Sequence, residues 1–223
     1  MGSSPRNVFI AGGTGYIGTR LIKALLRRGH QVRALARQGS ERKLPAGAVP
    51  VTGDALHGIS YAGQVPPSDT FVHLVGVSHP SPAKAQDFLR IDLASVQAAV
   101  PAAVVAGIRN FVYVSVAHPA PVMRAYVAAR MRAEEIIRSS GLAATMIRPW
   151  YVLGPGHRWP YAMVPVYWLL KLLPPTRAGA LRLGLVTWRQ MVSALVYAVE
   201  APSDGLRVME VPEIRAALDF QAI

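Results

Sequence analysis

The stretch IAGGTGYIGTRL at residues 10–21 decides the fold, because its three glycines stand between a short apolar run and an amphipathic helical pattern. A glycine triplet in that context is typical of a dinucleotide-binding turn. Gly12 permits a tight turn, Gly15 lets backbone amides approach a pyrophosphate, and Gly18 allows the helix to pack closely on the strand. The amino end of the helix then stabilises the pyrophosphate charge. We therefore predict a bound dinucleotide at this loop.

Short apolar runs alternate with longer helical patterns along the rest of the chain. Strands are predicted at 8–11, 32–36, 49–52, 71–75, 111–114 and 143–148. Helical patterns occupy 15–28, about 89–106, about 122–139 and 187–200. Strands that are almost continuously apolar are typical of a parallel sheet covered by helices on both faces. We expect an α/β fold with a doubly wound parallel sheet, a Rossmann fold.

Length and composition indicate one globular domain. The chain has 223 residues, of which 52% are hydrophobic and 16% charged, a balance that excludes a disordered chain. We predict a single domain over 1–223, in which 156–223 contributes a small substrate or lid region. The sequence has no cysteine, which excludes disulfides and iron–sulfur clusters, so redox chemistry would need a bound cofactor. His and carboxylate residues do not cluster at metal-ligand spacing, and we expect no metal.

Charge and hydropathy limit the partners. The net charge is +12, but the arginines are spread along the chain without a nucleic-acid reading motif, so we expect no nucleic acid. The polar start at 1–7 leads directly into the first strand, which predicts a cytoplasmic protein. The longest uncharged stretch, 93–108, contains Pro101 and is too short for a membrane span. We interpret it as a buried helix and expect no transmembrane segment.

The spacing of the glycines and four later segments resemble the short-chain dehydrogenase/reductase superfamily, in particular its extended and atypical branches. The four segments are GDA at 53–55, HLVG at 73–76, AGIRNFVYVS at 106–115 and GLAATMIRPWYVLGP at 141–155. Together with the glycine loop they cover most of residues 7–155. The most similar groups are the NmrA-like proteins and the nucleotide-binding accessory subunit of respiratory complex I, and the chain also resembles the NAD-dependent epimerases and dehydratases.

The resemblance implies where the cofactor would lie. Asp54 would face the adenine, the edge of strand four would approach a ribose, and the Arg-Pro turn after strand six would lie beside the nicotinamide. The implied cofactor-binding residues are Gly12, Thr14, Gly15, Tyr16, Ile17, Gly18, Arg33, Arg37, Asp54, Ala55, Leu74, Val75, Gly76, Ser115, Arg130 and Pro149. The Pro-rich loops at 78–84 and 117–122 should rim the site, because ligands bind at the carboxyl edge of such sheets.

The charges near strand two favour NADP(H) over NAD(H). Sites selective for NAD(H) place an acidic residue about twenty positions after the glycines, where it binds the ribose hydroxyls. Between Gly18 and Ser40 the chain has no Asp or Glu, whereas Arg33 and Arg37 flank the end of strand two. Arg37 stands where a 2'-phosphate would lie, and a charge-assisted hydrogen bond would hold it.

The catalytic residues of the family are only partly present. Active members have Ser or Thr after strand five and a Tyr-x-x-x-Lys on the next helix. Here Tyr126 is followed four residues later by Arg130, and Val116 occupies the usual serine position, one past Ser115. Arginine holds a charge but is not interchangeable with an ammonium. We predict Tyr126 as proton donor, Arg130 as the group that holds the ribose, and Ser115 as the third catalytic candidate.

Three further features of the sequence bear on the site. His118 is interpreted as a loop histidine that caps backbone, with proton donation at the rim as the alternative. Gln190 replaces the family's usual Asp. The segment WPYAMVPVYWLLKLLPP at 159–175 carries one charge, and an apolar substrate pocket, a dimer interface, contact with a membrane surface and core packing all stay open.

Two function classes follow, with a third below them. The first is an NADP(H)-dependent oxidoreductase that acts on a small apolar carbonyl or quinone-like compound, as a monomer or homodimer. The second is a noncatalytic NAD(P)-binding redox sensor or assembly factor, which the altered triad favours. A nucleotide-sugar epimerase or dehydratase ranks lowest, because the complete triad and a larger substrate domain are missing.

Overall fold

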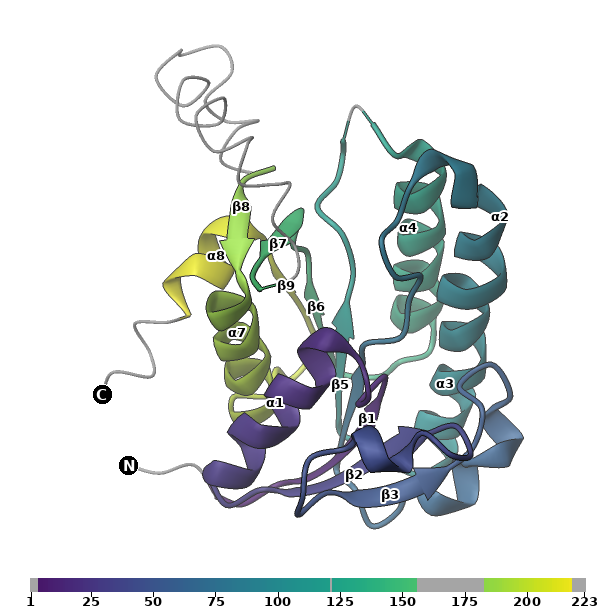
Figure 1. Cartoon of the computed structure of the whole chain (residues 1–223), viewed down its shortest axis with the longest axis vertical. Coiled ribbons are helices and arrows are strands. Elements are labelled where there is room, and N and C mark those ends of the chain that lie inside the picture. Colours follow the sequence, from purple (N-terminus) through teal and green to yellow (C-terminus); the bar gives the residue numbers. More distant parts are fainter. Residues whose placement is uncertain (1–3, 121, 156–182, 218–223) are drawn as a thin grey trace.

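The centre of the computed structural model, which describes residues 4–120, 122–155 and 183–217, is a seven-stranded parallel sheet (Figure 1). The strand order is β3-β2-β1-β4-β5-β6-β9. The strands are β1 (Asn7–Ala11), β2 (Gln31–Ala36), β3 (Val49–Thr52), β4 (Thr70–His73), β5 (Asn110–Val114), β6 (Ala144–Ile147) and β9 (Leu206–Met209). The order reverses between β1 and β4, which is the switch point where doubly wound sheets bind ligands.

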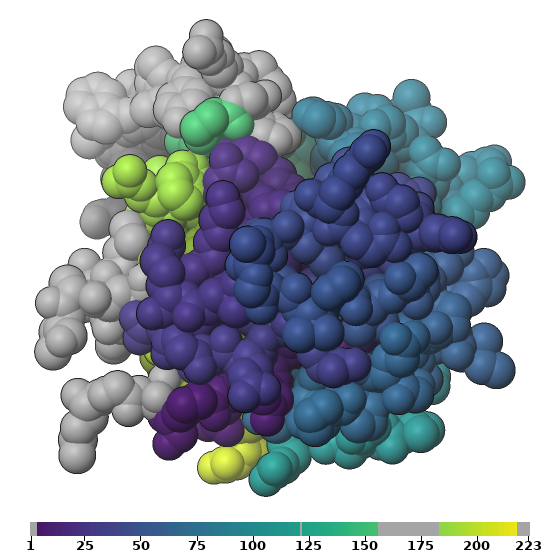
Figure 2. Space-filling model, turned by 60° about the horizontal axis from the view of Figure 1, so that its bottom comes forward, coloured from purple at the N-terminus to yellow at the C-terminus, as the bar shows by residue number. Residues whose placement is uncertain are grey.

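Helices cover both faces of the sheet (Figure 1). On one face lie α1 (Tyr16–Arg27), α7 (Trp188–Glu200) and the short α8 (Val211–Ala216). On the other lie α3 (Ala94–Val105) and α4 (Arg124–Ser139). Because successive strand residues point to opposite faces, Ile10 packs in the first core and Phe9 in the second. The amino-terminal half of the chain, coloured purple and blue, makes up most of the face turned forward in Figure 2.

The six strands and four helices expected from the sequence are present, and the Rossmann fold is confirmed. Three short strands of the described residues were not predicted from the sequence. β9 extends the sheet beside β6, and β7 (Tyr151–Leu153) pairs with β8 (Leu185–Thr187) in a separate two-stranded parallel sheet. Each has three or four residues, and β9 is partly exposed with an arginine inside it, so none shows a long apolar run. The segment 159–175 lies outside the described residues.

A continuous helical run from Pro82 to Val105 leads over the second face. It comprises a 3-10 turn (Pro82–Lys84), α2 (Ala85–Asp87), a π-helical turn (Phe88–Leu93) and α3. By length and composition alone this run could span a membrane. Half of its apolar window is buried inside the protein, where α3 packs against the sheet as a core helix.

Candidate cofactor and substrate site

The glycine turn after β1 is shaped for close backbone approach. Gly12 has a φ of +89°, and a Cβ there would lie 2.9 Å from the carbonyl carbon of Leu74. The Gly15 amide donates to the Gly12 carbonyl at 3.1 Å, and α1 begins at the next residue. A Cβ at Gly18 would overlap the Gly12 carbonyl oxygen, so close packing of the helix on the turn requires glycine. These residues fit a pyrophosphate at the start of α1.

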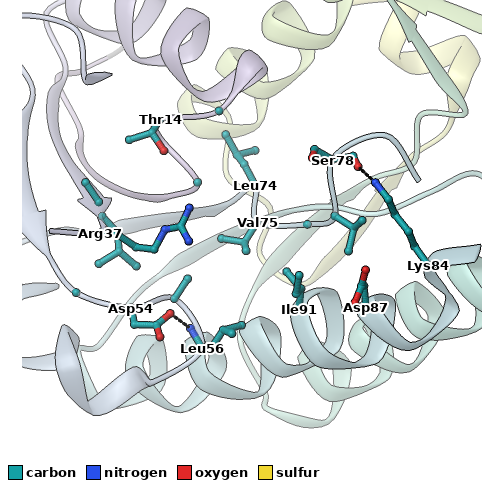
Figure 3. A pocket seen from close by; sticks show the side chains of 18 residues that line it. Thr14, Arg37, Asp54, Leu56, Leu74, Val75, Ser78, Lys84, Asp87 and Ile91 are labelled. Carbon is teal, nitrogen blue, oxygen red and sulfur yellow. Dashed lines mark hydrogen bonds between the residues drawn. The ribbon is translucent and has the colours of Figure 1, made fainter. Parts of the chain in front are cut away.

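A cleft of about 500 Å³ opens beside this turn, at the carboxyl edge of the sheet (Figure 3). Nine of the predicted cofactor residues line it: Gly12, Thr14, Gly15, Arg37, Asp54, Ala55, Leu74, Val75 and Gly76. They come from loops that follow β1, β2, β3 and β4, which lie next to one another in the sheet. Parallel strands thus bring residues far apart in the sequence to one elongated cleft.

One end of the cleft carries Arg37 and Asp54 (Figure 3). The Asp54 carboxylate accepts hydrogen bonds from the Leu56 amide at 3.0 Å and from His57 Nδ1 at 2.9 Å. The Leu56 bond, with smaller contributions from His57 and the charge of Arg37, lowers the pKa of Asp54. This end of the cleft therefore presents a fixed anion beside an arginine.

Arg33, the other arginine predicted at the cofactor, does not line the cleft. Its Nε donates to the Gln64 carbonyl at 3.1 Å, outside the cleft. Arg33 stands inside β2, three positions before its end at Ala36, whereas Arg37 is the first residue after the strand. Of the two arginines, Arg37 lines the cleft, together with Leu35 and Ala36 at the end of β2, and Arg33 does not.

The other end of the cleft carries Lys84 and Asp87, which the sequence analysis did not single out (Figure 3). The Lys84 ammonium donates to the Ser78 carbonyl at 2.7 Å and to the His79 carbonyl at 3.1 Å. These bonds close the Pro-rich loop 78–84 onto the helical run that follows it. The only signal in the sequence was the prediction that this loop rims the site.

A second cavity of about 340 Å³ adjoins the cleft and contains the predicted catalytic tyrosine. Its lining is largely apolar and aromatic: Tyr16, Ile17, Val77, His79, Pro80, Val114, Ser115, Val116, Met123, Tyr126, Pro149, Trp150, Tyr151 and Val152. Val77 lines the cleft as well, so the two spaces share a wall. Tyr16, Ile17, Ser115 and Pro149, predicted to touch the cofactor, lie on this side.

Arg130 is buried close to Tyr126 rather than exposed in either space. Its guanidinium carbon lies 5.3 Å from the centroid of the Tyr126 ring, and its side chain is 6% exposed. Its Nη2 forms an ion pair with Asp92 Oδ1 at 2.6 Å, and its Nη1 donates to the Val114 carbonyl at 2.7 Å. Within the described part of the chain, Arg130 lines neither cavity. The sequence places Tyr126 and Arg130 on one helix face, but it does not reveal Asp92.

Ser115 is held by a buried carboxylate. Its hydroxyl donates to Glu134 Oε1 at 2.7 Å, and Glu134 also accepts hydrogen bonds at 2.8 Å from Arg148 Nε and from Arg138 Nη2. Burial acts to raise the pKa of Glu134, but His118, Arg148 and Ser115 together hold that pKa well below its usual range. Ser115 therefore offers lone pairs, not its proton, to the cavity. Glu134 was not predicted, because its partners come from distant segments.

Two further residues singled out in the sequence, His118 and Gln190, make contacts that stabilise the fold. His118 Nε2 lies 3.5 Å from Glu134 Oε1, so this histidine belongs to the same buried cluster. Gln190 forms a capping box at the start of α7: its amide donates to Thr187 Oγ1 at 3.2 Å, and its side-chain oxygen accepts from the Thr187 amide at 2.8 Å. Gln190 thus stabilises a helix end.

Residues 12–158 match the family model described as NAD(P)H-binding. The chain belongs to this NAD(P)H-binding family. The matched range contains the glycine turn, the cleft and Tyr126, so the family and the geometry point to the same site. The domain is an NAD(P)H-binding domain with a Rossmann fold.

Two curated relatives of this chain are named as reductases. The chain is 30% identical to a ceramide reductase of Caulobacter vibrioides over 67% of its own length and 47% of the relative. It is 26% identical to the 4-hydroxy-2-methyl-3-oxo-4-farnesyl-3,4-dihydroquinoline-1-oxide ketoreductase of Stigmatella aurantiaca, over 66% of its length and 50% of the relative. The chain thus spans about half the length of these two relatives.

Solved structures share the fold at low identity. The Bordetella bronchiseptica enzyme WbmH in complex with NAD+ superposes with a TM-score of 0.68 at 19% identity, covering 98% of this chain and 82% of that one. A UDP-galactose 4-epimerase superposes with a TM-score of 0.68 at 17% identity, covering 91% and 75%. These likenesses concern the fold alone.

Proposed function

We propose that this chain is an NADP(H)-dependent oxidoreductase that acts on an apolar carbonyl or quinone-like compound. The observation that carries the proposal is the shared wall at Val77, where a cleft with a dinucleotide turn meets an apolar cavity that contains Tyr126. A reduction needs the cofactor and the substrate side by side, with a proton donor on the substrate side. The two adjoining spaces meet that requirement.

In this proposal the glycine turn and the adjoining residues hold the cofactor. Gly12 and Gly15 leave room for the pyrophosphate, and Arg37 binds the 2'-phosphate of NADP(H). A charge-assisted hydrogen bond contributes roughly 1.5 to 3 kcal/mol, which corresponds to about a ten- to hundredfold preference over NAD(H). When bound, the nicotinamide supplies a hydride.

The chain's own residues then bind the substrate and move the proton. Tyr126 donates its phenolic proton to the carbonyl oxygen, which acquires negative charge during reduction. The aromatic side chains of Trp150 and Tyr151 pack against the apolar part of the substrate and exclude water. Ser115, whose proton is engaged by Glu134, accepts a hydrogen bond from a donor group on the substrate.

The names of the relatives support a reductase with an apolar substrate, since one is a ceramide reductase and the other a ketoreductase of a farnesyl-bearing compound. A nucleotide-sugar epimerase or dehydratase ranks lower, because the cavity around Tyr126 is mainly apolar. The second candidate is a noncatalytic NADP(H)-binding sensor or assembly factor. It is favoured by the buried Arg130 and by Val116, because among the described residues that line the cavity of Tyr126 there is no exposed cation and no hydroxyl at position 116.

The test compares wild type with Tyr126→Phe, using Tyr197→Phe on α7 as a matched control outside both cavities. NADPH affinity is measured by fluorescence titration, and NADPH oxidation is followed over a panel of aldehydes, ketones and quinones with short and long apolar substituents. We expect Tyr126→Phe to bind NADPH normally but to lose at least a hundredfold in kcat. Tight NADPH binding by a wild type that oxidises NADPH with no compound would favour the sensor. Failure to bind NADPH would refute both.

A further inference from the structure

Arg130 is enclosed by groups that line both cavities. A Cβ added at Gly76, in the cofactor cleft, would collide with Arg130 Nη2. On the other side, Arg130 Nη1 donates to the carbonyl of Val114, which lines the apolar cavity, and lies 3.2 Å from the Tyr113 hydroxyl. The guanidinium therefore lies just behind the walls of the two spaces and inside the protein.

Asp92 is the counter-ion of this arginine and has a second task. Its side chain is fully buried, and its Oδ1 lies 2.6 Å from Arg130 Nη2. The other carboxylate oxygen, Oδ2, accepts a hydrogen bond at 3.0 Å from the backbone amide of Val77. Val77 is a residue that lines both cavities. One carboxylate thus holds the shared wall with one oxygen and the buried cation with the other.

Asp92 comes from the π-helical turn Phe88–Leu93, which departs from regular α-helix geometry just before α3. Such turns are frequent at functional sites, because they redirect side chains that a regular helix would place elsewhere. The same turn provides Phe88, whose ring lies 5.0 Å from the ring of Tyr126. The turn therefore contacts the two features that the reaction would need in place, the wall at Val77 and the proton donor.

The charges of this cluster balance internally. Removing one member of a buried ion pair leaves an uncompensated charge, which is strongly unfavourable, whereas replacing both members together is often tolerated. The imidazole of His73, on β4, is fully buried, and burial followed by the charge of Arg130 lowers its pKa to about 3. Because His73 stays neutral, Arg130 is the cation that Asp92 neutralises.

We infer that Asp92 is a positioning residue that fixes the Val77 backbone where cofactor and substrate would meet, and that Arg130 is its buried counter-ion and does not contact the cofactor. This inference rests on the proposed function for its catalytic consequence. It also changes the role of Arg130 from the one expected from the sequence, in which this residue holds the ribose.

The test uses two double variants in which both charges are removed. Asp92→Asn/Arg130→Met keeps a side-chain oxygen that accepts from the Val77 amide, whereas Asp92→Leu/Arg130→Met does not. Arg132→Met, an exposed position on α4, controls for loss of one arginine from this helix. Each protein is assayed for NADPH affinity, for kcat and KM with a substrate found in the panel above, and for hydrogen exchange in a peptide that covers residues 74–80.

We expect both double variants to bind NADPH within threefold of wild type. The Asp92→Leu/Arg130→Met protein should lose at least tenfold in kcat and exchange the 74–80 peptide at least tenfold faster, and the Asp92→Asn/Arg130→Met protein should keep kcat and exchange within threefold. Equal exchange in both double variants overturns the positioning role, even without turnover. The inference is also overturned if both double variants lose NADPH affinity tenfold or more, or if both lose kcat to the same extent. Either result would make Arg130 a functional residue. A wild type that does not bind NADPH contradicts the proposed function instead, and the exchange comparison still decides the role of Asp92.

Discussion

Replacing Arg37 with alanine should remove most of the preference for NADP(H). Arg37 is the first residue after β2 and lines the end of the cleft that also carries Asp54. Its side chain is solvent-exposed, so a bond to the 2'-phosphate should contribute near the low end of the usual range, about 1.5 kcal/mol. That value corresponds to about a tenfold loss of NADPH affinity. NADH has no 2'-phosphate, and its affinity should change less than twofold.

The assay is a fluorescence titration of NADPH and NADH with wild type, Arg37→Ala and Arg42→Ala. Arg42 is an exposed arginine of the turn Glu41–Lys43 and lies outside the cleft, so it reproduces the change in net charge without the proposed contact. Raising the salt concentration from about 0.05 to 0.5 M should reduce the discrimination of wild type, since exposed charge pairs are screened. Equal affinities of wild type for the two cofactors would refute the reasoning. An Arg37→Ala protein that loses NADH affinity as strongly as NADPH affinity would refute it as well.

Three other outcomes are expected. Gly12→Ala should abolish binding of both cofactors in the same titration, because the added Cβ would meet the Leu74 carbonyl and the backbone φ is positive. Retained affinity would contradict this prediction and show that the turn adapts. Glu134→Gln should lower the free energy of unfolding at pH 7 by about 3 kcal/mol, measured by urea denaturation, because Arg148 loses its buried partner. As a control, Glu135→Gln at an exposed position should change that free energy by less than about 0.5 kcal/mol. The native pKa of Glu134 lies below its ordinary value of 4.5, so its stabilisation is complete above pH 4.5 and is lost as the pH falls, and wild type should lose stability below that pH more steeply than Glu134→Gln.

The parts of the site that could be predicted from the sequence are those that depend only on residues adjacent in the sequence. The glycine turn needs only a strand before it and a helix after it, and Arg37 needs only the end of a strand, so both follow from adjacent residues. Arg33 lies inside β2 and donates to the carbonyl of Gln64, a contact with a distant segment that the strand pattern does not reveal. Asp92 and Glu134 could not be found in this way, since their partners Arg130 and Arg148 come from other elements of the fold. A single acidic residue in a helical pattern gives no sign that it will be buried beside a cation.

The small sheet of β7 and β8 has a consequence for how this protein could diversify. In its parallel register Tyr151 pairs with Leu185 and Leu153 with Thr187, so the chain departs from the carboxyl edge and rejoins it at neighbouring points, directly before α7. The closure of an intervening segment costs only about 0.6 kcal/mol more for each doubling of its length. Insertions or replacements between the two strands would therefore leave the nucleotide frame and α7 in place. The part of the chain between β7 and β8 could therefore be lengthened or exchanged without rebuilding the glycine turn and the strand ends that line the cleft.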